Sequence, residues 1–456
     1  MKKLAAGLLA IAALSAHAED AQGIWSGIIA DQVKVVLTVS RAAGGSWEAT
    51  LASPTQGFST KVEQFATDPT HISFAIAKFN ASYQATWNEK DKAWTGTWTQ
   101  GRTAPLILQR IDAAGVAALQ PKRPQESAIA SASAPYASVD IQFASAALQL
   151  AGSLTLPRGA GPWPAVVLVH GSGPNNRDEE IFGHKIFLVL ADHLARQGIA
   201  VLRYDKRGVG KSSGDFKAAT TMDFAADAQA AFAFLRSRPE IDGRRIGLVG
   251  HSEGGLIAPI VAAREPQLGF IVMMAGPGVR GELLMVEQLA LGSESDGAAL
   301  AKLAKERTMN QALFAAIVGE RDREQARIKA LGILEQGERD GLLPPGMAAK
   351  EAASFTSPWF HAFLSLEPGV ALQAVRQPVL ALNGALDRQV PSKLDLDAIR
   401  AALAHNPRAV VKELPKLNHL FQTATTGAGD EYAAIEETLA PSALAVMADW
   451  IRSQVQ

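Results

Sequence analysis

The feature that most constrains the fold is a regular alternation of strand-length apolar runs with helical patterns, from about residue 139 to the end of the chain. The near-continuous apolar runs are 165–169, 199–204, 245–249, 270–275, 379–383 and 409–414. Helical patterns separate or follow most of them, at 187–197, 223–236, 257–263 and 442–451. Strands that are apolar on both faces and joined by helices predict an α/β fold with a mostly parallel, covered sheet. Such sheets carry their chemistry at the carboxyl ends of the strands.

Residues 19–111 differ in texture and predict a separate, β-rich amino-terminal domain. Short stretches rich in Val, Thr, Ile and Trp are separated by Gly, Asn and Asp, at 33–39, 46–51, 71–77, 83–88, 93–99 and 106–110. The region also holds Trp25, Trp47, Trp87, Trp94 and Trp98. We expect these large aromatic side chains to fill the domain core, and a sugar-stacking platform is the alternative.

Two segments interrupt the strand patterns. Residues 112–138 are crowded with Ala, Ser, Pro and charged residues without clean periodicity, and they predict a linker to a catalytic domain spanning 139–456. Between about residues 278 and 358 the sequence is helical throughout. An insertion of this kind between two core strands predicts a lid over the functional site, and a helical excursion without such a role is the alternative.

The first 18 residues have the pattern of an export signal. Lys2 and Lys3 give a positive start, residues 4–14 are apolar, and residues 16–18 read Ala-His-Ala, a small-x-small cleavage signal. The apolar stretch is too short to span a bilayer comfortably, although an uncleaved anchor is the alternative. We therefore expect a periplasmic or secreted protein without stable membrane insertion after cleavage.

The composition argues against several classes of function. The formal net charge is −1, with 44 basic and 45 acidic residues, which gives no electrostatic reason to expect nucleic acid or an anionic membrane as a partner. The chain has no cysteine, so disulfides, thiolate catalysis and Cys-based zinc sites are excluded. The histidines lack the H-E-x-x-H spacing or a similar one, and we expect neither metal nor cofactor.

A candidate nucleophile stands in the pentapeptide GHSEG at residues 250–254, which matches the nucleophile-elbow pattern G-x-S-x-G. Ser252 follows an apolar strand and precedes a helical pattern, as that elbow requires. Ser212 lies in a second match at 210–214, but it follows a loop. The same loop fails as a phosphate-binding pattern because position 205 is Asp where glycine is needed. We therefore assign the nucleophile to Ser252.

A serine hydroxyl needs an oriented base to become a nucleophile at neutral pH. In this kind of sheet the partners should follow in the order Ser, acid, His, each just after a later strand. Asp387 comes directly after the run 379–383, and His419 comes just past the run that ends at Leu414. The alternatives for the base are His361 and His405. The alternatives for the acid, Asp395 and Asp397, start a helical pattern, where carboxylates favour the helix dipole.

Attack on a carbonyl also requires two donors for the oxyanion that forms. One should be the backbone N–H of Glu253, directly after the nucleophile. The other should come from the glycine-containing loop HGSGP at 170–174, which follows the run 165–169. Ser172 is our first choice for this donor and Gly173 the second, whereas we expect His170 to support the loop.

Five segments together resemble the α/β-hydrolase family over residues 139–456: HGSGP, YDKRGVGKSSG, GHSEGG, LNGALDRQVP and LPKLNHLFQ. Within that family they look most like bacterial serine carboxylesterases of the EstD type, which carry a β-rich amino-terminal domain. The resemblance implies a triad of Ser252, Asp387 and His419 and a preference for esters of short to medium acyl chains. The segments are also similar to serine aminopeptidases and to prolyl-oligopeptidase-type peptidases, but no propeller-like repeat precedes the domain.

The expected reaction is transfer of an acyl group to water by way of an acyl-enzyme, with a small-molecule ester as substrate. A peptidase or amidase with the same triad is one alternative. A non-catalytic binding protein on a hydrolase scaffold is another. The natural substrate, the role of the β-rich domain and the oligomeric state do not follow from the sequence.

Overall fold

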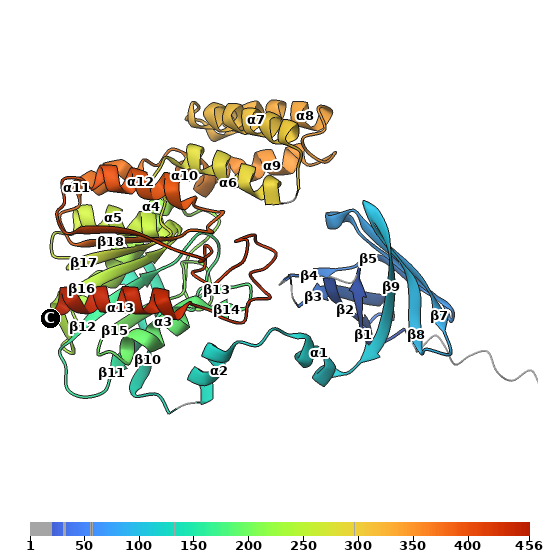
Figure 1. The fold of residues 1–456 in the computed structure, drawn as a ribbon, viewed down its shortest axis with the longest axis horizontal. Helices are drawn as coiled ribbons and strands as arrows, with labels where there is room; N and C mark the ends of the chain where they lie inside the picture. Colours follow the sequence, from blue (N-terminus) through green and yellow to red (C-terminus); the bar gives the residue numbers. More distant parts are fainter. Residues whose placement is uncertain (1–20, 31–32, 55, 57, 132, 296) are drawn as a thin grey trace, which may run out of the picture. The chain divides into compact units, whose positions relative to one another are not determined.

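The computed structural model describes residues 21–456 apart from 31–32, 55, 57, 132 and 296. The export signal predicted for residues 1–18 lies outside the described residues. The chain divides into two compact units, Met1–Lys122 and Arg123–Gln456 (Figure 1). Among the described residues, no helix has both the length and the apolar character needed to cross a membrane.

The first unit is built around one antiparallel sheet (Figure 1), in the order β4-β3-β2-β1-β9-β8-β7-β6-β5. In chain order its strands are β1 (Gly23–Ile29), β2 (Val33–Arg41), β3 (Trp47–Ser53), β4 (Phe58–Lys61), β5 (Glu63–Thr67), β6 (His71–Ile76), β7 (Ala81–Asn88), β8 (Ala93–Gln100) and β9 (Arg102–Ile111). Trp25 and Trp94 are fully buried, and Trp98 is nearly so. Ring centroids of Trp87 and Trp94 lie 5.2 Å apart, edge to face. This burial confirms that the tryptophans fill the core of the unit.

The second unit contains a sheet of eight strands, in the order β10-β11-β15-β12-β16-β17-β18-β19. In spatial order these are β10 (Tyr136–Ser145), β11 (Leu148–Pro157), β15 (Ala200–Tyr204), β12 (Trp163–Val169), β16 (Ile241–His251), β17 (Phe270–Met274), β18 (Val379–Gly384) and β19 (Ala409–Leu414). From β15 to β19 all pairings are parallel. The α/β fold with a separate β-rich domain is thus confirmed.

Helices cover both faces of this sheet (Figure 1). Along β12, Val166 and Leu168 pack with α3 (Ile186–Ala195) and α13 (Pro441–Val455). Val167 and Val169 point to the other face, into the core shared by α4 (Thr221–Arg236), α5 (Glu253–Arg264) and α12 (Ser392–Ala402). Since successive side chains of a strand alternate between faces, both faces of β12 are apolar and the strand reads as one continuous apolar run.

Two parts of this unit differ from the sequence expectation. The apolar runs miss the antiparallel pair β10–β11, because most of β10 is exposed and Ser138, Asp140 and Gln142 interrupt its apolar residues. The predicted linker contains two short helices, α1 (Ala113–Leu119) and α2 (Pro124–Ser131). Asp112 caps α1 by accepting from the N–H of Gly115. The two units divide after Lys122, within the predicted linker. Directly after this division, the Arg123 side chain donates to backbone carbonyls of the second unit, at Phe182, Gly183, Ala433 and Ile435. Helices this short show no clear periodicity in sequence.

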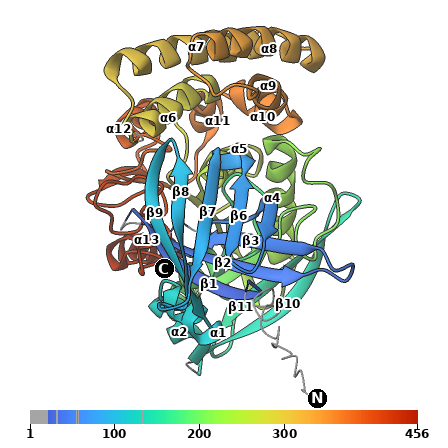
Figure 2. The ribbon, with the colours of Figure 1, turned by 90° about the vertical axis from the view of Figure 1, so that its right-hand side faces the viewer.

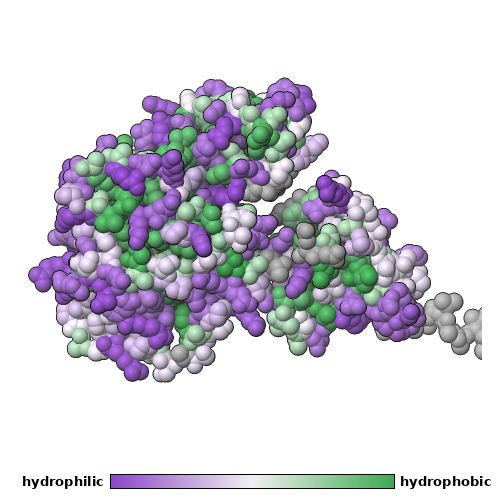
Figure 3. All heavy atoms as spheres, in the orientation of Figure 1, coloured by the Kyte–Doolittle hydropathy of each residue, from purple (hydrophilic) through white to green (hydrophobic). Residues whose placement is uncertain are grey.

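The predicted helical insertion between β17 and β18 is present and runs beyond residue 358. It consists of α6 (Gly281–Ser295), α7 (Leu300–Val318), α8 (Arg323–Arg339), α9 (Ala348–Phe355), α10 (Pro358–Leu364) and α11 (Pro368–Ala374). The helices α7 and α8 lie side by side at the outer end of this insertion (Figure 2). On the visible face of the second unit, hydrophilic side chains surround smaller groups of apolar ones (Figure 3).

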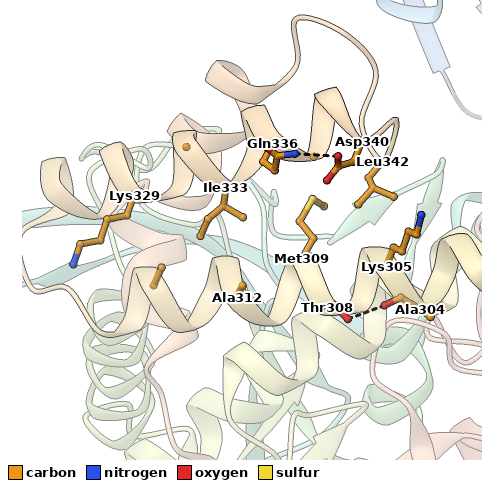
Figure 4. A pocket seen from close by; sticks show the side chains of 13 residues that line it. Ala304, Lys305, Thr308, Met309, Ala312, Lys329, Ile333, Gln336, Asp340 and Leu342 are labelled. Atoms are coloured by element: carbon orange, nitrogen blue, oxygen red, sulfur yellow. Dashed lines mark hydrogen bonds between the residues drawn. The ribbon is translucent and has the colours of Figure 1, made fainter.

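A groove of about 1060 Å³ lies between α7 and α8 (Figure 4). Met309 of α7 and Ile333 of α8 contribute to its apolar wall, and Lys305 and Asp340 lie at its side. None of the predicted catalytic residues lines it. The groove is therefore separate from the predicted catalytic residues.

Candidate active site

Ser252 stands in the turn between strand β16, which ends at His251, and helix α5, which begins at Glu253. Its backbone is strained, with φ 53° and ψ −116°, a combination that residues with a side chain rarely adopt. Two glycines make this turn possible. A Cβ on Gly250 would lie 2.0 Å from the carbonyl oxygen of Gly254, and one on Gly254 would lie 1.9 Å from that of Val169. The strand, turn and helix that the elbow pattern requires are all present.

The second G-x-S-x-G serine is a structural residue of its loop. The hydroxyl of Ser212 donates to the carbonyl of Asp205 at 2.7 Å and accepts from the N–H of Ala151 at 2.9 Å. The Asp205 carboxylate in turn accepts from the guanidinium and the N–H of Arg177. Ser212 is therefore committed to hydrogen bonds that fix the loop after β15.

Asp387 and His419 are brought together at the ends of the neighbouring strands β18 and β19. Nδ1 of His419 lies 2.7 Å from Oδ2 of Asp387, and both side chains are buried. The other carboxylate oxygen of Asp387 accepts from the N–H groups of Gln389 and Val390 at 2.8 Å each. With both carboxylate oxygens occupied, Asp387 holds the imidazole so that its Nε2 is the free nitrogen.

His251, the residue directly before Ser252, contacts this pair. The Nε2 of His251 donates to the carbonyl oxygen of His419 at 3.0 Å, and the two rings have centroids 5.0 Å apart. Within the described part of the chain, the Ser252 hydroxyl makes no hydrogen bond to the His419 imidazole. In unliganded enzymes this bond is often long and tightens when substrate binds.

The histidines considered as alternative bases make structural contacts elsewhere. The Nε2 of His361 bonds to the carbonyl oxygen of Glu320 at 2.8 Å. His405 is exposed and bonds to the carbonyl of Val375 and to Arg376. Neither ring is bonded to Asp387.

Of the alternative acids, Asp397 forms an exposed ion pair with Arg400, whereas Asp395 is fully buried. One carboxylate oxygen of Asp395 accepts from the N–H groups of Gly278 and Val279, where the helical insertion begins. Burial raises the pKa of Asp395 to about 7, and the nearby charge of Asp387 acts in the same direction. Asp395 therefore anchors the start of the insertion.

The loop Gly171–Ser172–Gly173, which follows β12, has all three of its carbonyl oxygens held. Lys206 Nζ donates to the carbonyl of Gly171 at 2.7 Å and to that of Gly173 at 3.3 Å. The Asn175 side chain donates to the carbonyls of Gly171 and Ser172 at 3.0 and 2.9 Å. The N–H groups of Ser172 and Gly173 donate to no described residue. This arrangement leaves the amides predicted to bind an oxyanion without a competing acceptor.

The third predicted donor, the N–H of Glu253, belongs to the first turn of α5, where a helix offers no internal acceptor. The Glu253 side chain is buried and accepts three hydrogen bonds. They come from Lys206 Nζ at 3.1 Å, from the Thr221 hydroxyl at 2.7 Å and from the Trp359 indole N–H at 2.6 Å. Glu253 thus joins the loop Gly171–Ser172–Gly173, through Lys206, to helix α10 of the insertion.

Another buried carboxylate lies behind the nucleophile. Oε1 of Glu179 accepts from the N–H of Gly171 at 2.5 Å and lies 3.2 Å from Nδ1 of His251. Burial opposes the charged form of His251, but the carboxylate of Glu179 raises the pKa of this imidazole overall. In contrast, burial lowers the pKa of His170 to about 4, so this ring is neutral and packs against Phe187 and Tyr204.

Sequence reasoning missed Lys206, Trp359 and Glu179. Lys206 and Glu253 lie 47 residues apart, and Trp359 and Glu253 lie 106 residues apart. The one sequence signal for Lys206 is its place beside Asp205 in the motif YDKRGVGKSSG, and no local pattern indicates that it pairs with Glu253.

A cavity of about 240 Å³ opens in front of Ser252, with helices α6 and α10 of the insertion supplying much of its wall. It is lined by Ser172, Ser252, Glu253, Pro277, Leu284, Met285, Gln288, Trp359, Phe360, Phe363, Gln389 and Val390. The insertion therefore borders the candidate site, although the aromatic residues of α10 lie just beyond the predicted boundary at residue 358.

The sheet order and the strand–turn–helix at Ser252 define an α/β-hydrolase fold. The chain belongs to the Alpha/beta hydrolase family, whose model matches residues 166–435. It is 30% identical over 276 residues to Esterase EstD of Thermotoga maritima, covering 60% of this chain and 58% of that protein. It is also 30% identical over 143 residues to Esterase FrsA of Klebsiella pneumoniae subsp. pneumoniae, covering 31% of this chain and 32% of that protein. The resemblance expected from the sequence motifs is confirmed.

The chain therefore spans about three fifths of EstD and one third of FrsA. Among solved structures, an esterase of Pyrococcus furiosus is similar with a TM-score of 0.44 and 14% identity, covering 70% of this chain and 94% of that chain.

Proposed function

We propose that the protein is a serine esterase that hydrolyses carboxylic esters by way of an acyl-enzyme. The observation that carries this proposal is the buried Asp387–His419 pair at 2.7 Å, which His251 contacts directly before Ser252 in its strained elbow. Membership of the hydrolase family and two relatives named as esterases support the same reaction class. An orienting acid, a base and a serine that lines a cavity are the three groups that acyl transfer requires.

In the proposed mechanism the Ser252 hydroxyl attacks the ester carbonyl while Nε2 of His419 takes its proton. Asp387 holds the imidazole through Nδ1 and stabilises the imidazolium. The N–H groups of Ser172 and Glu253, with Gly173 as the further candidate, donate to the oxyanion. The C–O bond to the alcohol then breaks, and His419 protonates the departing oxygen. Water attacks the acyl-enzyme, His419 takes its proton, and the acid leaves with Ser252 restored.

The size of the reactive cavity supports a short or medium acyl group. Its volume of about 240 Å³ is below the range of roughly 300–1,000 Å³ that is usual for ligand pockets. Leu284, Met285 and Phe363 give it apolar walls. A chain of a few carbons fits this volume and this chemistry.

The test is hydrolysis of p-nitrophenyl butyrate by wild type, Ser252→Ala and Ser212→Ala. Loss of the nucleophile should lower kcat by about 10⁶-fold, as in a comparable serine hydrolase. The matched variant Ser212→Ala should stay active, since Ser212 satisfies the same pentapeptide pattern but is bonded into its loop. A fluorophosphonate probe should label Ser252. Activity that survives Ser252→Ala, or a label on another serine, would overturn the proposal, and a much faster rate on an aminoacyl amide would favour an amidase.

We also propose that the protein is exported, on the basis of the signal pattern at residues 1–18. Sequencing the amino terminus of the protein purified from its native host tests this. A mature chain beginning at residue 19 is the expected result, and an intact Met1 would contradict it.

A further inference from the structure

A second cavity adjoins the reactive one on the side of the oxyanion loop. Its volume is about 800 Å³, and it shares Ser172, Trp359 and Phe360 with the reactive cavity. Helices α8, α9 and α10 and the segment after β15 supply its other walls. A substrate whose ester lies at Ser252 can therefore extend past Ser172 into this space. Here we call it the outer cleft.

The charged side chains of the outer cleft leave an excess of two positive charges. The lining contains Lys217, Arg323, Glu324 and Arg327. Arg327 donates to both carboxylate oxygens of Glu324, at 2.6 and 2.9 Å, so these two charges offset each other. The side chains of Lys217 and Arg323 make no ion pair or hydrogen bond with a described residue. This local excess contrasts with the formal net charge of −1 for the whole chain.

The remaining walls combine aromatic side chains with the neutral hydroxyl residues Ser172, Ser354, Thr356 and Ser357. Phe216 and Phe360 contribute apolar surface, together with Trp359. The Trp359 ring stacks on Phe363 with centroids 5.0 Å apart, and its indole N–H is already bonded to Glu253. Trp359 therefore presents a fixed apolar face, and the unpaired cations are the groups most able to recognise a charged ligand.

We propose that the outer cleft binds a carboxylate carried by the ester substrate, so that the preferred substrates are esters with an apolar part and a remote negative charge. This inference rests on the proposed esterase function and adds the chemical class of the substrate. Lys217 and Arg323 supply the opposite charge. Because both cations are exposed, their effect is modest and depends on salt.

The experiment measures kcat/KM for pairs of esters that differ only in a remote charge. One pair places it on the acyl side, as p-nitrophenyl hydrogen glutarate against p-nitrophenyl pentanoate. The other places it on the alcohol side, as 4-carboxyphenyl butyrate against 4-carbamoylphenyl butyrate. In Lys217→Gln/Arg323→Gln, the ratio of charged to neutral ester should fall about 3- to 30-fold for at least one pair at low salt. Neutral esters should keep their kcat/KM within about twofold, and 0.5 M NaCl should remove most of the difference.

Lys305→Gln is the matched control, because Lys305 is an exposed lysine on the groove between α7 and α8. It should leave both ratios unchanged. Unchanged ratios in the Lys217→Gln/Arg323→Gln variant, or an equal fall in Lys305→Gln, would overturn the inference. If neutral esters are hydrolysed in a Ser252-dependent way but the ratios do not move, only this inference fails. If no ester is hydrolysed, the proposed function fails.

Discussion

Replacing Lys206 with methionine is expected to destabilise the second unit and to slow ester hydrolysis. Lys206 and Glu253 have side chains only 3% and 1% exposed, with Nζ 3.1 Å from the carboxylate. Removing the ammonium leaves Glu253 as an uncompensated buried charge. Breaking a buried ion pair in this way costs about 3–5 kcal/mol.

The remaining contacts of Glu253 and Gly171 favour a loss of stability at the lower end of this range, about 3 kcal/mol. Glu253 keeps the donors Thr221 and Trp359, and the carbonyl of Gly171 keeps the Asn175 side chain. A loss of about 3 kcal/mol corresponds to a fall in Tm of roughly 6–12 °C for a large domain. The loop that carries the Ser172 amide becomes less fixed, so kcat should fall by up to about 10²-fold, the lower limit for removing one oxyanion donor.

Thermal unfolding followed by circular dichroism, together with kcat on p-nitrophenyl butyrate, measures both effects. Lys211→Met is the matched control, because the Lys211 side chain is 73% exposed, and it should change neither quantity. In the double variant Lys206→Met/Glu253→Gln no unpaired charge is buried, so part of the lost stability should return. A single variant within about 1 kcal/mol of wild type, or a double variant less stable than the single one, would refute the argument from the buried ion pair.

Three further predictions follow from the packing. Burial raises the pKa of Asp395 to about 7, so between about pH 4 and 7 the folded protein keeps a proton that the unfolded chain loses, and the free energy of unfolding of the wild type should fall as pH rises through this range. Asp395→Asn should remove this fall, which is roughly 4 kcal/mol at most. Urea unfolding of both proteins at pH 4.5 and 8 measures the difference. Gly254→Ala should abolish hydrolysis or folding, because the new methyl would lie 1.9 Å from the Val169 carbonyl, and equal activity would contradict the elbow geometry. Trp25→Ala should destabilise the first unit by about 3–5 kcal/mol while ester kcat stays unchanged, and a loss confined to kcat would show a catalytic rather than a core role.

Much of the second unit could be predicted from the sequence because its strands are buried on both faces. The strands β17 and β18 consist entirely of buried residues, so each gives an apolar run that a linear scan detects. The position of Asp387 followed from the end of such a run, and that of His419 from the end of β19, most of whose residues are exposed or half-buried. Ser252 could be distinguished from Ser212 only by the strand before it. Features that depend on a short stretch of sequence could therefore be predicted.

The remaining features depend on partners that are distant in sequence. The buried contacts of Glu253 reach Lys206 in one loop and Trp359 in another segment, and nothing near either residue indicates the pairing. The edge strand β10 escaped detection because an exposed strand need not be apolar. The helices of the predicted linker escaped because a cap and a proline can start a helix without apolar periodicity.

The hydrogen bond from the Trp359 indole to Glu253 couples the position of helix α10 to the order of the residues around Ser252. Helix α10 forms a wall of the reactive cavity, and its tryptophan is bonded to the residue directly after the nucleophile. Any outward swing of α10 that widens the entrance must break this bond, and Glu253 then loses one of three donors. The position of α10 is thus coupled to the hydrogen bonds that hold Glu253, the residue directly after Ser252, in place.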